Sequence, residues 1–555
     1  MKTINQYKSE KKQNPNSNNF SKMFRVTYLK LKDHPQLGNI ELDLCDDNEL
    51  RFEGKPYTTV IIGPNGTGKS FILRTIAEIF RQFNEYKISN NNRINLPFGL
   101  HIRYYLNGDQ YEIISKNLIT FKRDGGKLYN YGYYKNRPTN LLEYTEGFLK
   151  EIKSDFEIKL EDLVLPTKVL VSTGSIPDRF VFKNSAPEDF YQYLGVRSTN
   201  SSSSTKSAVG KTISSLFNSS IKSMDFVINL KDLLIFLGFR ESLTINYVTK
   251  INKLFFSGNL NSSNFIKYYE AWWESEFTYT NRKKENPIWS IPYYNSNFKN
   301  NPKAINELVE YINILINKPS FFKKKPKSSS KIIEIDILSN EVNQNDIAML
   351  THLENLDIIN LKGINFVKDA NSLSIEDVSS GEYHLLLSMI RIFSIIKEDS
   401  IVLIDEPEIS LHPNWQMKYI SFLKQVFANF HSCHFILTSH SHFIVSDLEG
   451  DSSKVIGLTR GLNQLIEVVP LAKNLNTFGW SAEEVLYSIF NVRSTRNSFL
   501  EYDLTKLVTM INRSSNEFSE IKRILKKVST LVLSENDPLK IIIEKAENYI
   551  ENYNA

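Results

Sequence analysis

Cysteine is nearly absent from this 555-residue sequence, which contains only Cys45 and Cys433. The two residues are far apart in the chain and lack the paired spacing of metal ligands. A disulfide framework and a cysteine-based metal centre are therefore both excluded as the basis of the fold. We expect two reduced thiols in a reducing compartment.

Long apolar runs are missing as well. The longest candidate, LLLSMIRIFSII, is too short to cross a bilayer and contains Arg391. The N-terminal stretch MKTINQYKSEKKQNPNSNNFSKM has no apolar segment of the kind that a secretion signal needs. Its Lys, Asn and Ser content predicts a disordered tail over residues 1–22. We expect a cytoplasmic protein without a membrane partner.

The sequence also lacks a strong excess of one charge. Its formal net charge is +5 and its pI is about 8.7. This balance permits binding to DNA or RNA but does not favour it. The length predicts either two or more folding units or one domain with a large insertion.

Two regions rich in strand patterns are separated by a long region with a different sequence pattern. Strand-like runs flank a helical pattern before residue 183, and similar runs return after residue 360. Helical patterns dominate between these regions and again after about residue 470. We predict an α/β core that is split by a large, mainly helical insertion and followed by a helical C-terminal region. The predicted divisions are 1–22 (tail), 23–183 (first core lobe), 184–360 (insertion), 361–470 (second core lobe) and 471–555 (C-terminal helices).

The segment GPNGTGKS follows the apolar strand TTVIIG and opens a helix, which is the context of a phosphate-binding loop. Glycines let backbone N–H groups wrap a phosphate, and the helix N-terminus adds to the attraction. Lys69 is expected to reach the β- and γ-phosphates, and the Ser70 hydroxyl to bind Mg²⁺. The alternative is an ordinary glycine-rich turn. The predicted ATP-binding residues are Gly63, Pro64, Asn65, Gly66, Thr67, Gly68, Lys69 and Ser70.

The segment IVLIDEPE has four apolar residues that end in two carboxylates. A buried strand would carry Asp405 to its C-terminal end, where α/β sheets place ligands. Asp405 is then suited to the Mg²⁺ shell, and Glu406 to polarising an attacking water. A strand that is followed by an acidic turn is the alternative.

The segment FILTSHSHF is a second apolar strand with a polar end. If it lies in the same parallel sheet as TTVIIG, its end reaches the phosphate-binding loop. Either His440 or His442 would then contact the γ-phosphate, whereas a lone histidine is more often structural.

The segment VSSGEYHLLLSMIRIF starts with a helix cap. Ser379 and Glu382 fit a capping box, but this motif requires neither Ser380 nor Gly381. A glycine beside a helix N-terminus also favours phosphate binding.

Together these motifs resemble the ABC-type ATPases of the RecF/SMC/OLD-like branch. The resemblance identifies residues 63–70 as Walker A, 401–405 as Walker B, Glu406 as the catalytic carboxylate and His440 as the switch histidine. It implies an ABC-ATPase-like core in which Lys69, Glu406 and His440 act in ATP hydrolysis. It also implies that the signature VSSGE binds ATP held by another subunit. That arrangement is a head-to-tail homodimer with two ATP and Mg²⁺ sites, in which the signature residues are Ser379, Ser380, Gly381 and Glu382.

Two further segments, KVLVSTGSIPDRF with YQYLGVRSTN and FGWSAEEVLYSIF, resemble the Septu-type and retron-associated Septu defence ATPases of bacteria. In that group the ATPase works with a separate HNH-type nuclease. This chain has neither a recognisable His-Asn-His arrangement nor clustered C-terminal carboxylates, and Glu483 and Glu484 fit a helix surface. We expect a regulatory ATPase that controls a nuclease partner.

Two other functions stay open. One is a RecF-like DNA-binding ATPase in DNA repair or chromosome maintenance. The other is a module that uses ATP only structurally, which the intact Lys69, Asp405 and Glu406 disfavour. The sequence reveals neither a lid glutamine nor an adenine-stacking residue, for which Tyr28 is one candidate.

Overall fold

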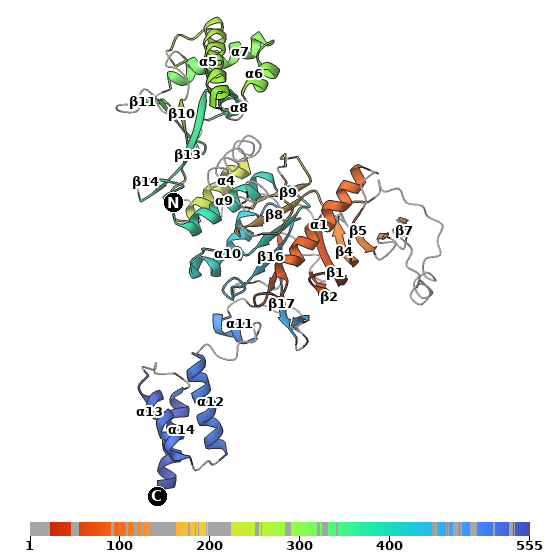
Figure 1. Ribbon diagram of the computed structural model, residues 1–555, viewed down its shortest axis with the longest axis vertical. Helices are drawn as coiled ribbons and strands as arrows, with labels where there is room; N and C mark the ends of the chain where they lie inside the picture. Colours follow the sequence, from red (N-terminus) through yellow and green to blue (C-terminus); the bar gives the residue numbers. More distant parts are fainter. Residues whose placement is uncertain are drawn as a thin grey trace, which may run out of the picture. The chain divides into compact units, whose positions relative to one another are not determined.

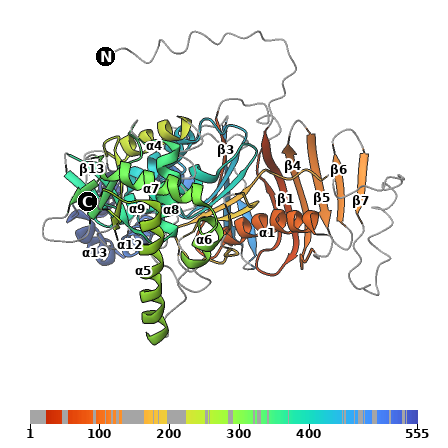
Figure 2. The ribbon, with the colours of Figure 1, turned by 90° about the horizontal axis from the view of Figure 1, so that it is seen from above.

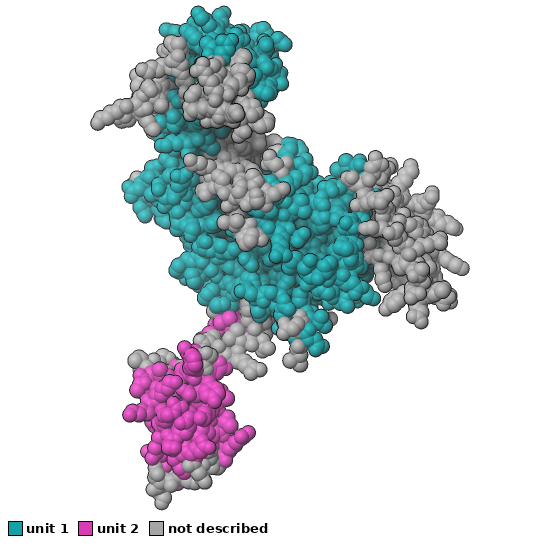
Figure 3. Space-filling model, viewed as in Figure 1, with its two compact units in different colours: residues 1–479 teal, residues 480–555 magenta. Residues whose placement is uncertain are grey.

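The computed structural model describes residues 23–554 with gaps, the longer of which are 46–54, 90–93, 132–162, 198–223, 250–254, 284–289, 325–330, 470–476, 489–496 and 532–536. The predicted tail, residues 1–22, lies outside the described residues. Residues 1–479 and 480–555 form separate compact units (Figure 3).

The first unit is built on a seven-stranded sheet with the order β18-β17-β3-β16-β15-β8-β9. Every neighbouring pair is parallel except β17 and β18. The inner strands are fully buried apolar runs, as expected for a parallel sheet covered on both faces. The strands are β3 (Tyr57–Ile62), β8 (Val169–Thr173), β9 (Tyr191–Tyr193), β15 (Ile401–Asp405), β16 (His434–Ser439), β17 (Ser453–Arg460) and β18 (Ile466–Val469).

Helix α1 (Lys69–Ile88) lies between this sheet and a second, antiparallel one (Figure 1), which is seen from above in Figure 2. Ile72, Ile76 and Phe80 follow one another at helical spacing, and all three are buried in the core that both sheets share. This core fixes the start of α1 against the end of β3. The second sheet has the order β2-β1-β4-β5-β6-β7 and consists of β1 (Phe24–His34), β2 (Gly38–Asp43), β4 (Gly99–Leu106), β5 (Asp109–Ser115), β6 (Ile119–Arg123) and β7 (Lys127–Tyr131).

Helices predominate in the predicted insertion, but an unpredicted antiparallel sheet accompanies them (Figure 1). The helices are α4 (Met224–Phe236), α5 (Ser262–Lys283), α6 (Ser290–Asn297), α7 (Pro302–Ile316) and α8 (Gln344–Asn355). The sheet has the order β11-β12-β10-β13-β14 and includes strands on both sides of residue 360. Its strands are β10 (Leu243–Thr249), β11 (Phe322–Lys324), β12 (Lys331–Asp336), β13 (Ile359–Lys368) and β14 (Asn371–Ser374).

Two helices complete the second half of the core, α9 (Ser380–Ile395) and α10 (Pro413–Val426). The second unit is helical and has its own apolar core. Its helices are α11 (Ala482–Ser488), α12 (Ser498–Asn512), α13 (Phe518–Ser529) and α14 (Leu539–Asn554). The observed fold is therefore mixed α/β, with a parallel central sheet and a helical C-terminal region. None of the helices among the described residues is both long and apolar enough to cross a bilayer.

Candidate active site

The carboxyl ends of three parallel strands meet at one edge of the central sheet. In the strand register, Asp405 of β15 pairs with Thr438 of β16, and Ser439 pairs with Ile62 of β3. The residues that follow these strands are therefore neighbours in space, as is typical of ligand sites in α/β sheets. The predicted placement of FILTSHSHF and TTVIIG in one parallel sheet is confirmed.

The loop between β3 and α1 is shaped for a phosphate. Gly68 has a φ of +81°, and a Cβ added there would lie 2.4 Å from Cδ2 of Leu37. The buried Lys69 ammonium donates hydrogen bonds to the carbonyl oxygens of Gly63 at 2.7 Å and Pro64 at 3.0 Å. Burial lowers the pKa of Lys69 to about 8. A phosphate can take over these donors, so the loop fits the β- and γ-phosphates of a nucleotide.

Ser70 and Asp405 are joined directly, although they come from opposite halves of the core. The Ser70 hydroxyl donates a hydrogen bond of 2.9 Å to Oδ1 of Asp405, and the Thr438 hydroxyl donates to the same oxygen. Burial raises the pKa of Asp405 to about 6. A buried carboxylate beside a hydroxyl fits Mg²⁺, which takes few protein ligands and completes its shell with water and phosphate. Sequence reasoning missed Thr438, because only strand pairing reveals its position.

Glu406 and His440 form a second pair beside the first. Nε2 of His440 lies 3.2 Å from Oε1 of Glu406, and Nδ1 of His440 lies 3.1 Å from Nζ of Lys69. The hydrogen bond from His440 lowers the pKa of Glu406 and keeps this carboxyl ionised at neutral pH. Glu406 has a φ of +51°, a costly conformation for a residue with a side chain. The structure thus places a carboxylate, an imidazole and an ammonium side by side.

A third carboxylate, Glu408, fixes the backbone of the histidine loop. Its Oε1 accepts hydrogen bonds from the Ser439 hydroxyl at 2.9 Å and from the backbone N–H of His440. Its Oε2 is buried and has no hydrogen-bond partner among the described residues. Burial raises the pKa of Glu408. Glu408 is the second glutamate of the segment DEPE, which marks it as a neighbour of the site. The sequence does not reveal what its side chain contacts.

The signature residues stand apart from this group. Ser379 and Glu382 form the predicted capping box at the start of α9, and Lys368 also pairs with Glu382 at 2.8 Å. Ser379 and Ser380 are exposed. A Cβ added to Gly381 would lie 2.4 Å from the carbonyl oxygen of Ser410, so glycine allows this close approach. Within the described part of the chain, no hydrogen bond joins these residues to Lys69, Ser70 or Asp405.

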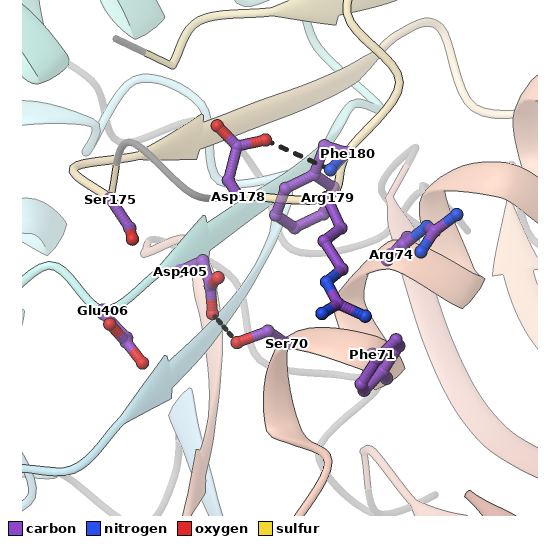
Figure 4. Close-up of a pocket in the computed structure, with 9 residues that line it drawn as sticks. All are labelled: Ser70, Phe71, Arg74, Ser175, Asp178, Arg179, Phe180, Asp405 and Glu406. Atoms are coloured by element: carbon purple, nitrogen blue, oxygen red, sulfur yellow. Dashed lines mark hydrogen bonds between the residues drawn. The ribbon is translucent and has the colours of Figure 1, made fainter. Parts of the chain in front are cut away.

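A pocket of about 250 Å³ opens beside the Ser70–Asp405 pair (Figure 4). Its lining includes Glu406 together with two arginines, Arg74 of α1 and Arg179, which comes after β8. Sequence reasoning missed both arginines. The segment GSIPDRF contains Arg179, but its place depends on β8 lying next to β15 in the sheet. The full lining is Ser70, Phe71, Arg74, Ser175, Asp178, Arg179, Phe180, Asp405 and Glu406.

His442, a candidate for the γ-phosphate contact, and Tyr28, a candidate for adenine stacking, have other contacts in the structure. His442 packs against Phe443 with ring centroids 4.0 Å apart. Tyr28 donates a hydrogen bond to Glu41, and the Arg103 guanidinium lies 4.2 Å from the centre of its ring. The structure therefore places His440, and not His442, beside Lys69. Glu483 and Glu484 are exposed on α11, and across the described residues no three of His, Cys, Asp and Glu cluster to hold a metal ion.

Comparison with known proteins gives a family and distant relatives. A family profile described as "AAA ATPase domain" matches residues 25–445. The chain is similar to the retron Vc95 probable ATPase of Vibrio cholerae, with 23% identity over 478 residues that span 81% of this chain and 78% of that protein. It is also similar to the Septu protein PtuA of Bacillus thuringiensis, with 24% identity over 119 residues, or 21% of this chain and 29% of that protein.

Among solved structures, the chain is similar to Smc head domains. The head of Pyrococcus furiosus Smc, bound to the C-terminal domain of ScpA, aligns with a TM-score of 0.31 and 13% identity, covering 81% of this chain and 96% of that one. The SMC head domain of Thermotoga maritima aligns with a TM-score of 0.31 and 12% identity, covering 80% and 99%.

Proposed function

This chain belongs to the AAA ATPase domain family, and we propose that it binds and hydrolyses ATP as a head-to-tail dimer that regulates a separate nuclease in a bacterial anti-phage defence system. The observation that carries the ATPase proposal is the meeting of two pairs at one sheet edge. Ser70 with Asp405 offers a Mg²⁺ site, and Glu406 with His440 offers a site for the attacking water.

The chemistry assigns a separate task to each group. Lys69 neutralises charge on the β- and γ-phosphates, and Mg²⁺ held by Ser70 and Asp405 supplies further positive charge when bound. The ionised Glu406 accepts a hydrogen bond from the attacking water and polarises it. His440 orients Glu406 from one side and faces the phosphate-binding loop from the other. Glu408 holds His440 in this place through its backbone N–H.

The signature supports a dimer. Ser380 and Gly381 begin a capped helix, whose N-terminal N–H groups favour an anion. Ser379 and Ser380 are exposed and share no hydrogen bond with the described phosphate-binding residues of their own chain. In a head-to-tail dimer, the N-terminus of this helix would face the ATP that is held by the partner subunit. The dimer then contains two composite sites.

The defence role rests on relatives. A retron ATPase is similar over most of this chain, and a Septu protein is similar over a shorter stretch. The segments after β8 and around α11 also resemble Septu-type ATPases, which work with HNH-type nucleases. ATP binding would close the dimer, and hydrolysis would reopen it. The insertion and the C-terminal helices would couple this conformational change to the nuclease.

The experiment that tests this role is recovery of the tagged chain from its native host with ATP and Mg²⁺, followed by mass spectrometry. We expect an HNH-type nuclease to co-purify, and to do so less when the bait carries Lys69→Ala. Recovery with DNA and repair factors, and without a nuclease, would contradict the defence role and favour a RecF-like repair ATPase. An exposed-site variant, Arg240→Ala, serves as the matched bait control.

A further inference from the structure

Arg179 is one of the two arginines that line the pocket beside Ser70 and Asp405. Its side chain is exposed and extends toward Ser70 and Phe71 (Figure 4). Its guanidinium lies 5.6 Å from the centre of the Phe71 ring. The same pocket is lined by Asp405 and Glu406. Arg179 therefore faces the place where the terminal phosphate of a bound ATP is expected.

The neighbouring carboxylate does not neutralise Arg179, because it already has other partners. Oδ1 of Asp178 accepts a hydrogen bond of 2.5 Å from Nη2 of Arg197. Oδ2 of Asp178 accepts one of 3.0 Å from Nε of Arg197 and one of 2.6 Å from the Tyr193 hydroxyl. This bidentate pair is buried on the aspartate side, with the Asp178 side chain fully covered. It anchors the base of the Arg179 segment and leaves the Arg179 charge to the pocket.

The second arginine of the pocket has a different neighbourhood. Arg74 lies on α1 and also lines an adjoining pocket together with His34 and Glu78. Burial would raise the pKa of Glu78, but hydrogen bonds from Arg81 and Gln82, with a smaller contribution from the charge of Arg74, lower it. The charge of Arg74 therefore already interacts with a nearby carboxylate outside the pocket that contains Ser70. Arg179 is thus the better placed of the two for an anion that enters beside Ser70.

We propose that Arg179 contacts the terminal phosphate of ATP bound by its own chain, and so distinguishes ATP from ADP. This inference rests on the proposed ATP-binding function. A guanidinium offers a planar fork of donors that matches phosphate oxygens, and hydrogen bonds between charged groups are the stronger kind. ADP lacks the phosphate that Arg179 would contact. The loss of Arg179 should therefore weaken ATP binding selectively.

The test compares the affinity of the full chain for a fluorescent β,γ-imido analogue of ATP and for fluorescent ADP, both with Mg²⁺. For Arg179→Ala we expect the Kd of the ATP analogue to rise about tenfold or more, while the Kd of ADP stays within about twofold. For Arg179→Lys, the Kd of the ATP analogue should lie between the values for the unmodified chain and for Arg179→Ala, because lysine keeps the charge but lacks the planar fork of donors. Arg240→Ala, at an exposed arginine outside the pocket, is the control.

Two results would overturn the assignment. Equal losses for ATP analogue and ADP would mean that Arg179 only supports the fold of the pocket, and unchanged affinities would mean that it does not meet the phosphate. Thermal unfolding without nucleotide checks that Arg179→Ala is folded, as expected for an exposed side chain. If the unmodified chain binds neither nucleotide, the proposed ATPase function fails, and this assignment fails with it.

Discussion

Nε2 of His440 lies 3.2 Å from Oε1 of Glu406. The two residues come from different strand ends, and the parallel register of β15 with β16 brings them together. The bond lowers the pKa of Glu406, so the carboxylate is an acceptor at neutral pH. This pair is the part of the site that we assign to the attacking water.

Replacing Glu406 with Gln should remove hydrolysis without removing ATP binding. The amide keeps the size of the side chain but loses the charge that polarises water, and general bases contribute on the order of 10² to 10⁴ in rate. We expect ATP turnover to fall at least about 100-fold, and the ATP-bound dimer to accumulate in size-exclusion chromatography with light scattering. Turnover at the unmodified rate would refute the assignment. Glu483→Gln, at an exposed carboxylate of α11, should leave both properties unchanged.

Replacing Ser70 with Ala should uncouple ATP binding from Mg²⁺. The Ser70 hydroxyl contacts Asp405, and both are assigned to the metal. Calorimetric titration with ATP should show tighter binding in Mg²⁺ than in EDTA for the unmodified chain, and a much smaller difference for Ser70→Ala. A full Mg²⁺ effect in the variant would show that the metal binds elsewhere. Ser421→Ala, at an exposed serine, is the matched control.

Replacing Glu408 should slow ATP turnover indirectly, because Glu408 holds His440 in place. Oε1 of Glu408 accepts the backbone N–H of His440, and an alanine removes this acceptor. We expect Glu408→Ala to lower kcat with little change in ATP affinity, because the phosphate-binding loop is untouched. Glu408→Gln keeps an acceptor oxygen and should retain most of the activity. Equal losses in the two variants would argue against this positioning role.

The parts of the site that lie within one segment were predictable from sequence. The loop before Lys69, the strand before Asp405 and the capping box of Ser379 and Glu382 are each defined by neighbours a few residues away. Local patterns of this kind report on backbone conformation directly.

The remaining parts depend on contacts between distant segments. Thr438 reaches Asp405, and Arg179 lines the pocket beside Asp405, only because β16 and β8 flank β15. Sequence periodicity does not specify the order of strands in a sheet. In the antiparallel sheet of the insertion, β11 with β12 and β13 with β14 are sequential hairpins, but the central strand β10 pairs with β12 and β13 across intervening helices. Sequence patterns do not reveal these long-range pairings, so the sheet was missed.

Replacing Glu382 with Ala should destabilise the signature helix. The capping box is lost, together with the pair to Lys368, at a cost of about 1 kcal/mol in free energy of unfolding. Burial alone would raise the pKa of Glu382, but Lys368 and Ser379 outweigh it and lower the pKa. The ionised form therefore stabilises the fold at neutral pH, and this gain is lost as the pH falls through the lowered pKa. In urea unfolding, the free energy of unfolding of the variant should be lower than that of the unmodified chain at pH 7, and this difference should narrow in acid. A difference that does not change with pH would contradict this account.

The central claim is that ATP is hydrolysed between two subunits, with the signature acting on the partner's nucleotide. Lys69→Ala disables the phosphate-binding loop, and Ser380→Glu puts a negative charge at an exposed signature position where a helix tolerates it. Each variant alone should be inactive. Mixed dimers contain one intact composite site, so ATP turnover by a mixture of the two variants is the decisive measurement. Recovered turnover is the predicted result, whereas an inactive mixture beside an active unmodified protein would contradict the claim.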